Sequence, residues 1–315
     1  MKRLDIDLSI SDNDILTTLK NLHRTDEKQG RLFESRKALL RELAFAISKG
    51  GRADADTIQN NYLSAFSAYT PDKKLWEDVG FFSGISIHDQ LTVCRYITEL
   101  LGNSLSFAES VLGQAEPCPE RAKGRISYVK NNYTDSAYLL FSSALRSPRC
   151  SYSDSFETIC EDVYNGESEF CILPIETSTD GKLFSFYSLI DRYELKITAV
   201  CSVEHPGGGK ITDFALLARS LSLPLKNKKN DLMMELRVYQ SLDQSAGIYD
   251  IFKAADACRM PLVRVDSIAL PYGNGLLSHY AVFSLSPSRL DELLTYLALE
   301  FPQCYVTGIY TKIKG

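Results

Sequence analysis

The sequence predicts an α+β protein made of three segments, and three observations support this fold class. Apolar residues first repeat at helical spacing, then short apolar strands alternate with helices from residue 124, and six further elements follow a polar linker at residues 224–230. Pro117 and Pro119 mark the first boundary. We therefore expect a helical segment at 1–116, an α/β segment at 124–223 and an α+β segment at 231–315.

Four helices are expected in the first segment. Ile15, Leu16, Leu19 and Leu22 share one helical face, and a second apolar series runs from Leu32 to Ile47. The pair Gly50-Gly51 ends this second helix. A third helix covers 53–68, and a fourth covers 87–112 and begins at Ser86 or His88.

The middle segment alternates between strand and helix patterns. The expected strands cover 126–129, 170–174, 195–203 and 211–220, and 151–156 is extended. The expected helices cover 136–145, 157–164 and 183–193. This alternation predicts a mostly parallel sheet that is covered by helices.

The last segment has a clear element order. A strand at 232–239 and a helix at 247–259 precede two strands, 262–270 and 276–285, which a glycine- and proline-containing turn joins. A helix at 289–301 and a strand at 305–313 complete it. The order βαββαβ is that of the ferredoxin-like arrangement.

Composition excludes several classes of protein. A formal net charge of -5 argues against nucleic-acid binding, which needs a concentrated basic face. We expect no membrane span and no signal peptide, and therefore a cytoplasmic protein. The 8 cysteines include no Cys-x-x-Cys pair and the 4 histidines are scattered, so we expect no metal and no cofactor. Cys171, Cys201 and Cys258 lie in apolar patterns that are typical of buried reduced thiols.

The most informative stretch is Phe170-Cys-Ile-Leu-Pro-Ile-Glu-Thr-Ser178. It predicts an apolar strand that stops at a proline and then presents a carboxylate and two hydroxyls. Many α/β folds present ligand-binding groups at the carboxyl ends of strands. The stretch resembles the Pro-Ile-Glu-Asn-Ser signature of prephenate dehydratases, and Asn165-Gly166-Glu167 before it resembles a turn of that family.

The resemblance extends to the other segments. The final segment looks like an ACT domain, and Val306-Thr-Gly-Ile-Tyr310 resembles the Gly-x-Tyr ending of ACT domains in these enzymes. Together the segments resemble the bifunctional chorismate mutase/prephenate dehydratase. This likeness implies a truncated periplasmic-binding-like central domain, a homodimer and a role in phenylalanine biosynthesis. Chorismate, prephenate and phenylalanine are the implied ligands.

The mutase likeness assigns substrate contacts to the helical segment. Family mutases bind a dianion with arginines and lysines, and Arg36 and Lys49 lie on one helix much as two such donors do. Ser104 matches a family serine, but Ala108 replaces the glutamine one turn later; Ser110 and Gln114 keep the same spacing. Alternatively, Arg36 and Lys49 are solvated charges on a helix face.

The dehydratase likeness assigns a second set of residues. Thr134 and Ser136 stand at a helix N-terminus, where they either bind a carboxylate or cap the helix. Glu176, Thr177 and Ser178 occupy the Glu-Asn-Ser positions, and Thr212 occupies the position of the catalytic threonine in Thr-Arg-Phe. The resemblance makes Thr212 the proton donor and Glu176 a possible acid.

Two departures from the family affect this site. Asp213 replaces an arginine that supports the anionic substrate, which turns attraction into repulsion. Only a short glycine-rich stretch separates His205 from Thr212, where the family inserts most of a second lobe. We therefore expect a hairpin there and no closed cleft, with Thr212 on an open surface or against the last segment.

The regulatory site also departs from the family pattern. The family's Glu-Ser-Arg-Pro is Asp266-Ser267-Ile268-Ala269 here. Gln244, Ser245 and Gly247 partly retain a loop whose backbone N–H groups meet a ligand carboxylate in the family. Gly247 alternatively serves only the turn from strand to helix.

Two hypotheses follow. The first is a catalytically degenerate, dimeric binding or regulatory protein that retains the fold. The second is an active enzyme, either a chorismate mutase or a prephenate dehydratase. The mutase reaction needs electrostatic complementarity rather than a nucleophile, so altered side chains are compatible with it.

Overall fold

The computed structural model describes residues 28, 30–45, 48, 86–100, 119–145, 148–206, 209–221, 232–241, 247–269, 276–301 and 304–313. The chain divides into two compact units, Met1–Leu101 and Gly102–Gly315. None of the helices in the described part is long and apolar enough to cross a membrane. The three-segment division with boundaries near 116 and 230 stays a prediction.

The first unit contains two described helical stretches. Residues 30–45 are helical, and α3 covers Ile87–Leu100. Leu40, Leu43, Leu91 and Ile97 are buried in this unit, as helical periodicity predicts. α3 begins after Ser86, whose hydroxyl accepts a hydrogen bond from the Asp89 N–H, so Ser86 is the cap that the sequence suggested.

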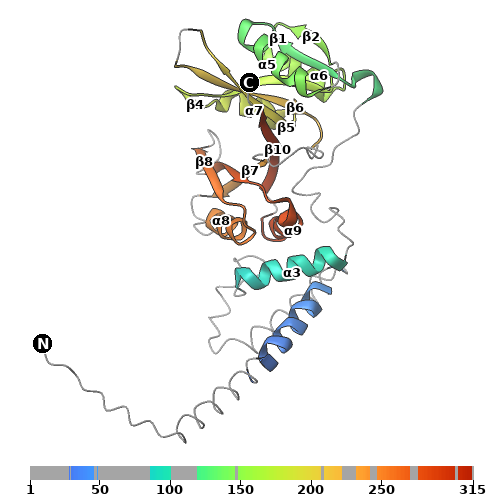
Figure 1. Ribbon diagram of the computed structural model, residues 1–315, viewed down its shortest axis with the longest axis vertical. Helices are drawn as coiled ribbons and strands as arrows, with labels where there is room; N and C mark the ends of the chain where they lie inside the picture. Colours follow the sequence, from blue (N-terminus) through green and yellow to red (C-terminus); the bar gives the residue numbers. More distant parts are fainter. Residues whose placement is uncertain are drawn as a thin grey trace, which may run out of the picture. The chain divides into compact units, whose positions relative to one another are not determined.

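The second unit is built on one ten-stranded mixed sheet (Figure 1). The strand order is β2-β1-β3-β6-β5-β10-β7-β9-β8, and β4 pairs with β3. The strands are β1 Arg125–Val129, β2 Arg149–Ser153, β3 Phe170–Thr177, β4 Gly181–Lys182, β5 Lys196–Glu204, β6 Ile211–Ala218, β7 Leu232–Ser241, β8 Leu262–Ala269, β9 Leu276–Ser284 and β10 Cys304–Ile313.

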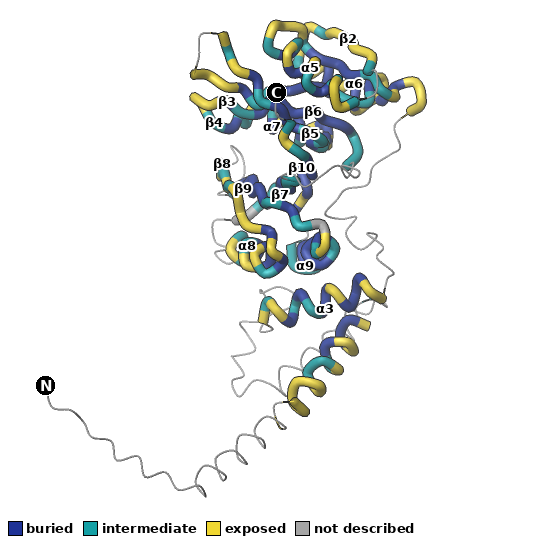
Figure 2. The backbone as a smooth tube through the Cα atoms, in the orientation of Figure 1, coloured by how far each residue is buried: buried dark blue, intermediate teal, exposed yellow. Residues whose placement is uncertain are grey.

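Helices cover this sheet on both faces. They are α5 Asn132–Ala144, α6 Phe156–Tyr164, α7 Phe184–Arg192, α8 Gly247–Ala257 and α9 Leu290–Glu300, with short 3-10 turns at η3 Glu120–Ala122 and η4 Pro287–Arg289. α5 packs on one face of the central strands through Ala137 and Phe141. α6 and α7 pack on the other face through Ile159 and Tyr187. Figure 2 shows the buried strands between these helices.

Local sequence explains where the helices begin. Asn131 caps α5 by accepting hydrogen bonds from the N–H groups of Tyr133 and Thr134, and Ser155 caps α6 by accepting one from Thr158. Because Asn131 is the cap, α5 starts at residue 132 rather than at the predicted 136. Before β1, Gly124 adopts a φ of 68°, a left-handed conformation that glycine adopts at little cost.

Two expectations about the sheet are wrong. Among the described strands most pairs are antiparallel, and the parallel ones are β1/β2, β1/β3 and β10/β5. In the centre of the sheet, β5 and β6 are antiparallel because the link between them is too short for a parallel crossover. This link makes the expected hairpin, in which the His205 N–H donates to the Lys210 carbonyl.

The strand β3 also continues past the proline where it was expected to stop. It reaches Thr177, and its pairing with β6 shifts register between Pro174 and Glu176. β1 pairs with β3 only at Phe170 and Cys171, so Pro174 removes no ladder hydrogen bond on that side. The bulge re-aims the residues that follow it.

The last six elements follow the predicted βαββαβ order, but their strands do not form a separate sheet. β10 lies between β5 and β7, so it joins the central strands to the C-terminal ones. Phe252 of α8 packs against Phe283 of β9 at 6.1 Å between ring centroids, which places α8 on one face of these strands.

Candidate functional site

The candidate site lies where β3 and β5 end and β6 begins. In the antiparallel pairing of β3 and β6, Glu176 lies opposite Asp213 and Thr177 lies opposite Thr212. Successive side chains of a strand point to opposite faces. Phe214, two residues from Thr212, packs with α5, whereas Ala215, two residues from Asp213, packs with α7. Thr212 and Glu176 therefore lie on opposite faces of the sheet.

Thr212 is buried on the α5 face. Its Oγ1 lies 2.8 Å from Nε2 of His205, and the His205 ring stacks on Tyr133 of α5 at 4.0 Å between centroids. Thr212 was expected either on an open surface or against the last segment; the open surface is wrong, because Thr212 is buried beside His205 on the α5 face. A hydroxyl beside an imidazole can exchange a proton with it, so this pair has the chemistry of a proton relay.

The neighbouring hydroxyls are engaged in turns. Thr177 Oγ1 donates to Asp180 Oδ2 at 2.8 Å and accepts from the Asp180 N–H at 2.9 Å. Hydrogen bonds from Thr177 and then Thr179 lower the pKa of Asp180. Ser178 Oγ accepts from the Ile211 N–H at 3.0 Å. These contacts hold the strand ends together.

The two hydroxyls at the start of α5 are also bonded locally. Thr134 Oγ1 donates to the Val129 carbonyl at 2.6 Å and accepts from the Asn131 N–H at 3.0 Å, which completes a capping box. Ser136 Oγ donates to the Asn132 carbonyl at 2.9 Å. The geometry matches the helix-capping alternative for Thr134.

Glu176 is engaged on the α7 face. It forms an ion pair with Arg264 of β8, whose guanidinium also donates to Asp266 Oδ1 at 2.9 Å. Burial alone would lower the pKa of Arg264, but the hydrogen bonds to Asp266 and Glu176 raise it above its ordinary value. Asp213 accepts from Ser202 Oγ at 2.6 Å and from Lys312 Nζ at 2.7 Å.

A buried charged cluster that the sequence did not reveal lies beside Glu176. Lys182 Nζ is 2.8 Å from Glu235 Oε1 and 4.2 Å from the centroid of the Tyr187 ring. The hydroxyls of Tyr187 and Tyr310 donate to Glu235 Oε2 at 3.3 and 3.4 Å. Burial, and next the charge of Glu235, raise the pKa values of both tyrosines.

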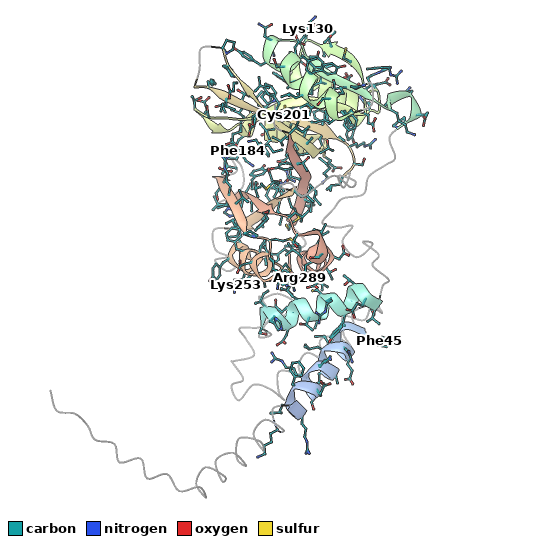
Figure 3. The ribbon with its side chains drawn as sticks, viewed as in Figure 1. Phe45, Lys130, Phe184, Cys201, Lys253 and Arg289 are labelled. Atoms are coloured by element: carbon teal, nitrogen blue, oxygen red, sulfur yellow. The ribbon has the colours of Figure 1, made fainter. Side chains whose placement is uncertain are left out.

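One signal in the sequence could have located this cluster. Glu235 and Arg237 interrupt an otherwise apolar strand at alternate positions, so both point to one face. Phe184, labelled in Figure 3, lies where α7 meets this face, and its ring is 5.9 Å from that of Tyr280. The cluster therefore fills the junction between the central and C-terminal strands.

The remaining predicted site residues belong to other elements of the chain or lie outside the described residues. Arg36 forms an ion pair with Asp89 of α3 within the first unit. Gly247 is the first residue of α8. Lys49, Ser104, Ser110, Gln114, Gln244 and Ser245 lie outside the described residues, as does the linker at 224–230. All of these assignments stay predictions.

The described residues include no group of three histidine, cysteine or acidic side chains that could hold a metal ion. Seven described cysteines are free, and Cys171, Cys201 and Cys258 are buried as expected. Burial raises the pKa values of Cys201 and Cys258 to about 12 in each case, so their thiols are poor nucleophiles.

No family model matches the sequence, and no curated protein matches it significantly. Among solved structures, the chain is similar to prephenate dehydratase from Streptococcus mutans, with a TM-score of 0.48 and 15% identity over 61% of this chain and 99% of that one. It is similar to prephenate dehydratase from Arthrobacter aurescens in complex with L-Phe, with a TM-score of 0.46 and 14% identity over 59% and 90%. It is also similar to GqqA, described as a novel type of quorum quenching acylase, with a TM-score of 0.46 and 17% identity over 60% of this chain and 95% of that one.

Proposed function

We propose that this chain is a catalytically inactive relative of prephenate dehydratases, a cytoplasmic, dimeric binding or regulatory protein linked to phenylalanine biosynthesis. Its Pro174-Ile-Glu-Thr-Ser178 stretch and its βαββαβ element order support the relationship. The ligand in this proposal is an aromatic acid or amino acid, and the last six elements are an ACT-like module.

The observation that carries the proposal is the separation of Glu176 from Thr212. A dehydratase must bring its proton donor and its substrate-binding groups around one substrate. Here the two side chains lie on opposite faces of β3 and β6. Thr212 is bonded to His205, and Glu176 is paired with Arg264. One small substrate cannot contact both without rearrangement of the strands.

The charges beside Glu176 support the same conclusion. Prephenate carries two carboxylates, so its binding needs cations that lack protein carboxylate partners. Lys182 pairs with Glu235, Arg264 with Glu176 and Asp266, and Lys312 with Asp213. Each of these three cations is thus already neutralised. Asp213 itself would repel the substrate.

The test is an assay of the purified full-length chain for phenylpyruvate formation from prephenate and for chorismate consumption. We expect both rates to equal the uncatalysed background. Turnover at ordinary enzymatic rates, abolished by Thr212→Ala in the first assay or by Arg36→Ala in the second, would overturn the proposal. Ser143→Ala, on the exposed side of α5, is a matched control.

A binding role makes a separate expectation. A ligand that binds the folded state raises the unfolding midpoint, and the stabilisation grows with the logarithm of one plus its concentration over its Kd. Phenylalanine is the first ligand to titrate, followed by tyrosine, prephenate and chorismate. A rise of several degrees with one of these ligands supports the proposal, whereas no shift with any of them at millimolar concentration contradicts it.

One observation favours the alternative of an active dehydratase. Thr212 Oγ1 is within hydrogen-bond reach of His205 Nε2, and the stacking of Tyr133 fixes the imidazole. Such a pair can deliver a proton to a leaving hydroxyl. If activity is present, this alternative requires that Thr212→Ser retain it and that His205→Ala lower it at least as much as Thr212→Ala. Otherwise the activity arises elsewhere.

A further inference from the structure

A second group of charged side chains lies at the opposite end of the central strands from the candidate site. Lys196 is the first residue of β5 and lies opposite Ala218, the last residue of β6, whereas Asp213 lies near the start of β6. The Lys196 Nζ donates to the Val306 carbonyl of β10 at 2.8 Å. Lys196 therefore lies where the central strands meet β10, away from the residues that the family resemblance assigns.

Lys196 is a half-buried cation without a carboxylate partner. Among the residues that the structure describes, no carboxylate oxygen lies within 4.0 Å of its Nζ, and its hydrogen bond goes to the Val306 carbonyl. Lys182 and Lys312, in contrast, each pair with a carboxylate. Removing an unpaired charge from water costs free energy, so a lysine in this position has the properties expected of a site for an external anion.

The acidic side chains around Lys196 do not neutralise it. Asp191 at the end of α7 pairs with Arg237 through Oδ1 and accepts from the Tyr280 hydroxyl through Oδ2 at 3.0 Å, so both of its oxygens are engaged. Burial, and next the charge of Arg237, lower the pKa of Lys196 to about 8, against the opposing charges of Glu194 and Asp191. A bound anion would favour the charged form of Lys196 and reverse this effect.

Tyrosine rings lie beside these cations. The Arg237 guanidinium is 4.7 Å from the ring centroid of Tyr239 and 5.4 Å from that of Tyr305, which lies opposite Arg237 in the pairing of β10 with β7. Tyr305 is 37% exposed and directly precedes Val306, whose carbonyl holds Lys196. A cation beside an exposed ring is complementary to a ligand that joins a carboxylate to an aromatic body.

We propose that Lys196 and Tyr305 form a binding site for a small aromatic acid, with the carboxylate on the Lys196 ammonium and the ring on Tyr305. This inference rests on the binding role in the proposed function and names the site and the class of its ligand. Lys196 and Arg237 both repel an ammonium group on the ligand. The site therefore favours an acid such as 3-phenylpropanoate over an amino acid such as phenylalanine.

A matched series of probes tests the class of ligand. 3-Phenylpropanoate, its neutral amide 3-phenylpropanamide and phenylalanine share the ring and differ in charge. Isothermal titration calorimetry of the full-length chain at pH 7 should show 3-phenylpropanoate binding about tenfold more tightly than either of the others, or more. Equal affinity for the acid and the amide would overturn the proposal.

The pH profile of the wild-type chain separates anion binding by Lys196 from a purely structural role, and it requires no variant. The anion binds the charged amine, and the free amine loses its proton near pH 8. Affinity for 3-phenylpropanoate should therefore be about tenfold weaker at pH 9 than at pH 7. Burial raises the pKa values of Tyr239 and Tyr280, so these hydroxyls stay protonated in this range.

Proton uptake gives an independent readout of the same site. At pH 8 the free lysine is partly neutral, so binding of the anion should draw a fraction of a proton from the buffer. Calorimetry in buffers of different ionisation enthalpy measures this fraction. Binding without proton uptake, or with equal affinity at pH 7 and 9, would show that Lys196 does not hold the carboxylate.

Two substitutions test the two halves of the site. Lys196→Met removes the ammonium and keeps an apolar stem, and Tyr305→Ala removes the ring. Each should weaken 3-phenylpropanoate binding by about tenfold or more while the circular dichroism spectrum is unchanged. Lys253→Met, at an exposed lysine of α8 that is labelled in Figure 3, is the matched control and should bind as the wild-type chain does. Wild-type affinity in either of the first two variants would contradict the site.

The outcomes also separate this inference from the proposed function. If phenylalanine or prephenate stabilises Lys196→Met as much as the wild-type chain, the ligand binds elsewhere, so this site is wrong while the proposed function stands. If 3-phenylpropanoate binds at Lys196 but phenylalanine, tyrosine, prephenate and chorismate have no effect, the site stands and the proposed function is wrong. Absence of binding by all of these compounds would overturn both.

Discussion

Lys182 and Glu235 form an ion pair of 2.8 Å between β4 and β7, and their side chains are only 3% and 2% exposed. The pair links the strand that follows the Pro174-Ile-Glu-Thr stretch to the first C-terminal strand. Tyr187 and Tyr280 place their rings next to the ammonium, and Tyr187 and Tyr310 donate to the carboxylate. Both charges therefore have partners in the interior, which offsets the cost of removing them from water.

We predict that Lys182→Met destabilises the fold by about 3–5 kcal/mol, because it leaves Glu235 as an unpaired buried charge. The double variant Lys182→Met/Glu235→Leu should be destabilised by at least about 1 kcal/mol less than the sum of the two single variants. Urea unfolding measures these values. Arg192→Met, which breaks the exposed pair with Glu157, is the matched control and should cost under about 1 kcal/mol. Strict additivity of the two buried substitutions would contradict this account.

We predict that the central and C-terminal strands unfold as one unit. β10 pairs with β5 on one side and with β7 on the other, so opening either half breaks a full ladder of hydrogen bonds along β10. Hydrogen exchange at increasing urea concentration should show peptides from β6 and β7 losing protection together. Loss of protection in β7 to β9 at a distinctly lower urea concentration would show that the C-terminal elements form an independent domain.

We predict that Gly308→Ala destabilises the fold by about 1–3 kcal/mol or more, because its new Cβ overlaps β5. A Cβ at Gly308 would lie 2.6 Å from both the Cβ and the carbonyl oxygen of Ile197. Since the oxygen belongs to the backbone, Ile197→Ala should not rescue the variant. Gly30→Ala meets no atom within 4 Å and should be neutral or stabilising by up to about 1 kcal/mol. Thermal unfolding of the three variants checks these signs.

We predict that Lys196 makes the fold more stable as the pH rises from about 8 to 10.5. Burial, and next the charge of Arg237, lower the pKa of Lys196 to about 8. In that window the unfolded chain binds the proton and the folded chain does not, so the free energy of unfolding increases with pH. Relative to Lys196→Met, the wild-type chain should gain on the order of 2 kcal/mol between pH 7 and 10.

Urea titrations of both proteins at each pH measure this difference, and the titration of buried tyrosines cancels between them. Lys196 also donates to the Val306 carbonyl at 2.8 Å, which adds an effect that is present at every pH. Parallel pH profiles of the two proteins would contradict the prediction.

The sequence identified most elements of the second unit because their signals are local. Asn131, Ser155 and Gly124 set the starts of helices and the turn before β1 without help from distant residues. The residues of Gly-x-Tyr were also noted, but their roles in the packing were not visible. Gly308 permits the close approach of β10 to β5, and Tyr310 donates to Glu235.

The partners of the candidate site residues could not be predicted from the sequence. Glu176 and Arg264 are separated by 88 residues, and Lys182 and Glu235 by 53. Their contacts depend on β10 inserting between β5 and β7, which no periodicity encodes. The bulge at Pro174 likewise decides which face Glu176 occupies, and the sequence instead suggested a strand that stops there.

By itself, the sequence determined the order of strands and helices and the hairpin between His205 and Thr212, because spacing, caps and turn residues act over a few neighbours. The tertiary structure alone decided that Thr212 is buried beside His205, that Glu176 lies on the other face, and that one sheet spans two segments. The physical reason is that strand pairing and burial of charge are set by residues far apart in the chain, whose register is fixed only when all the strands pack together.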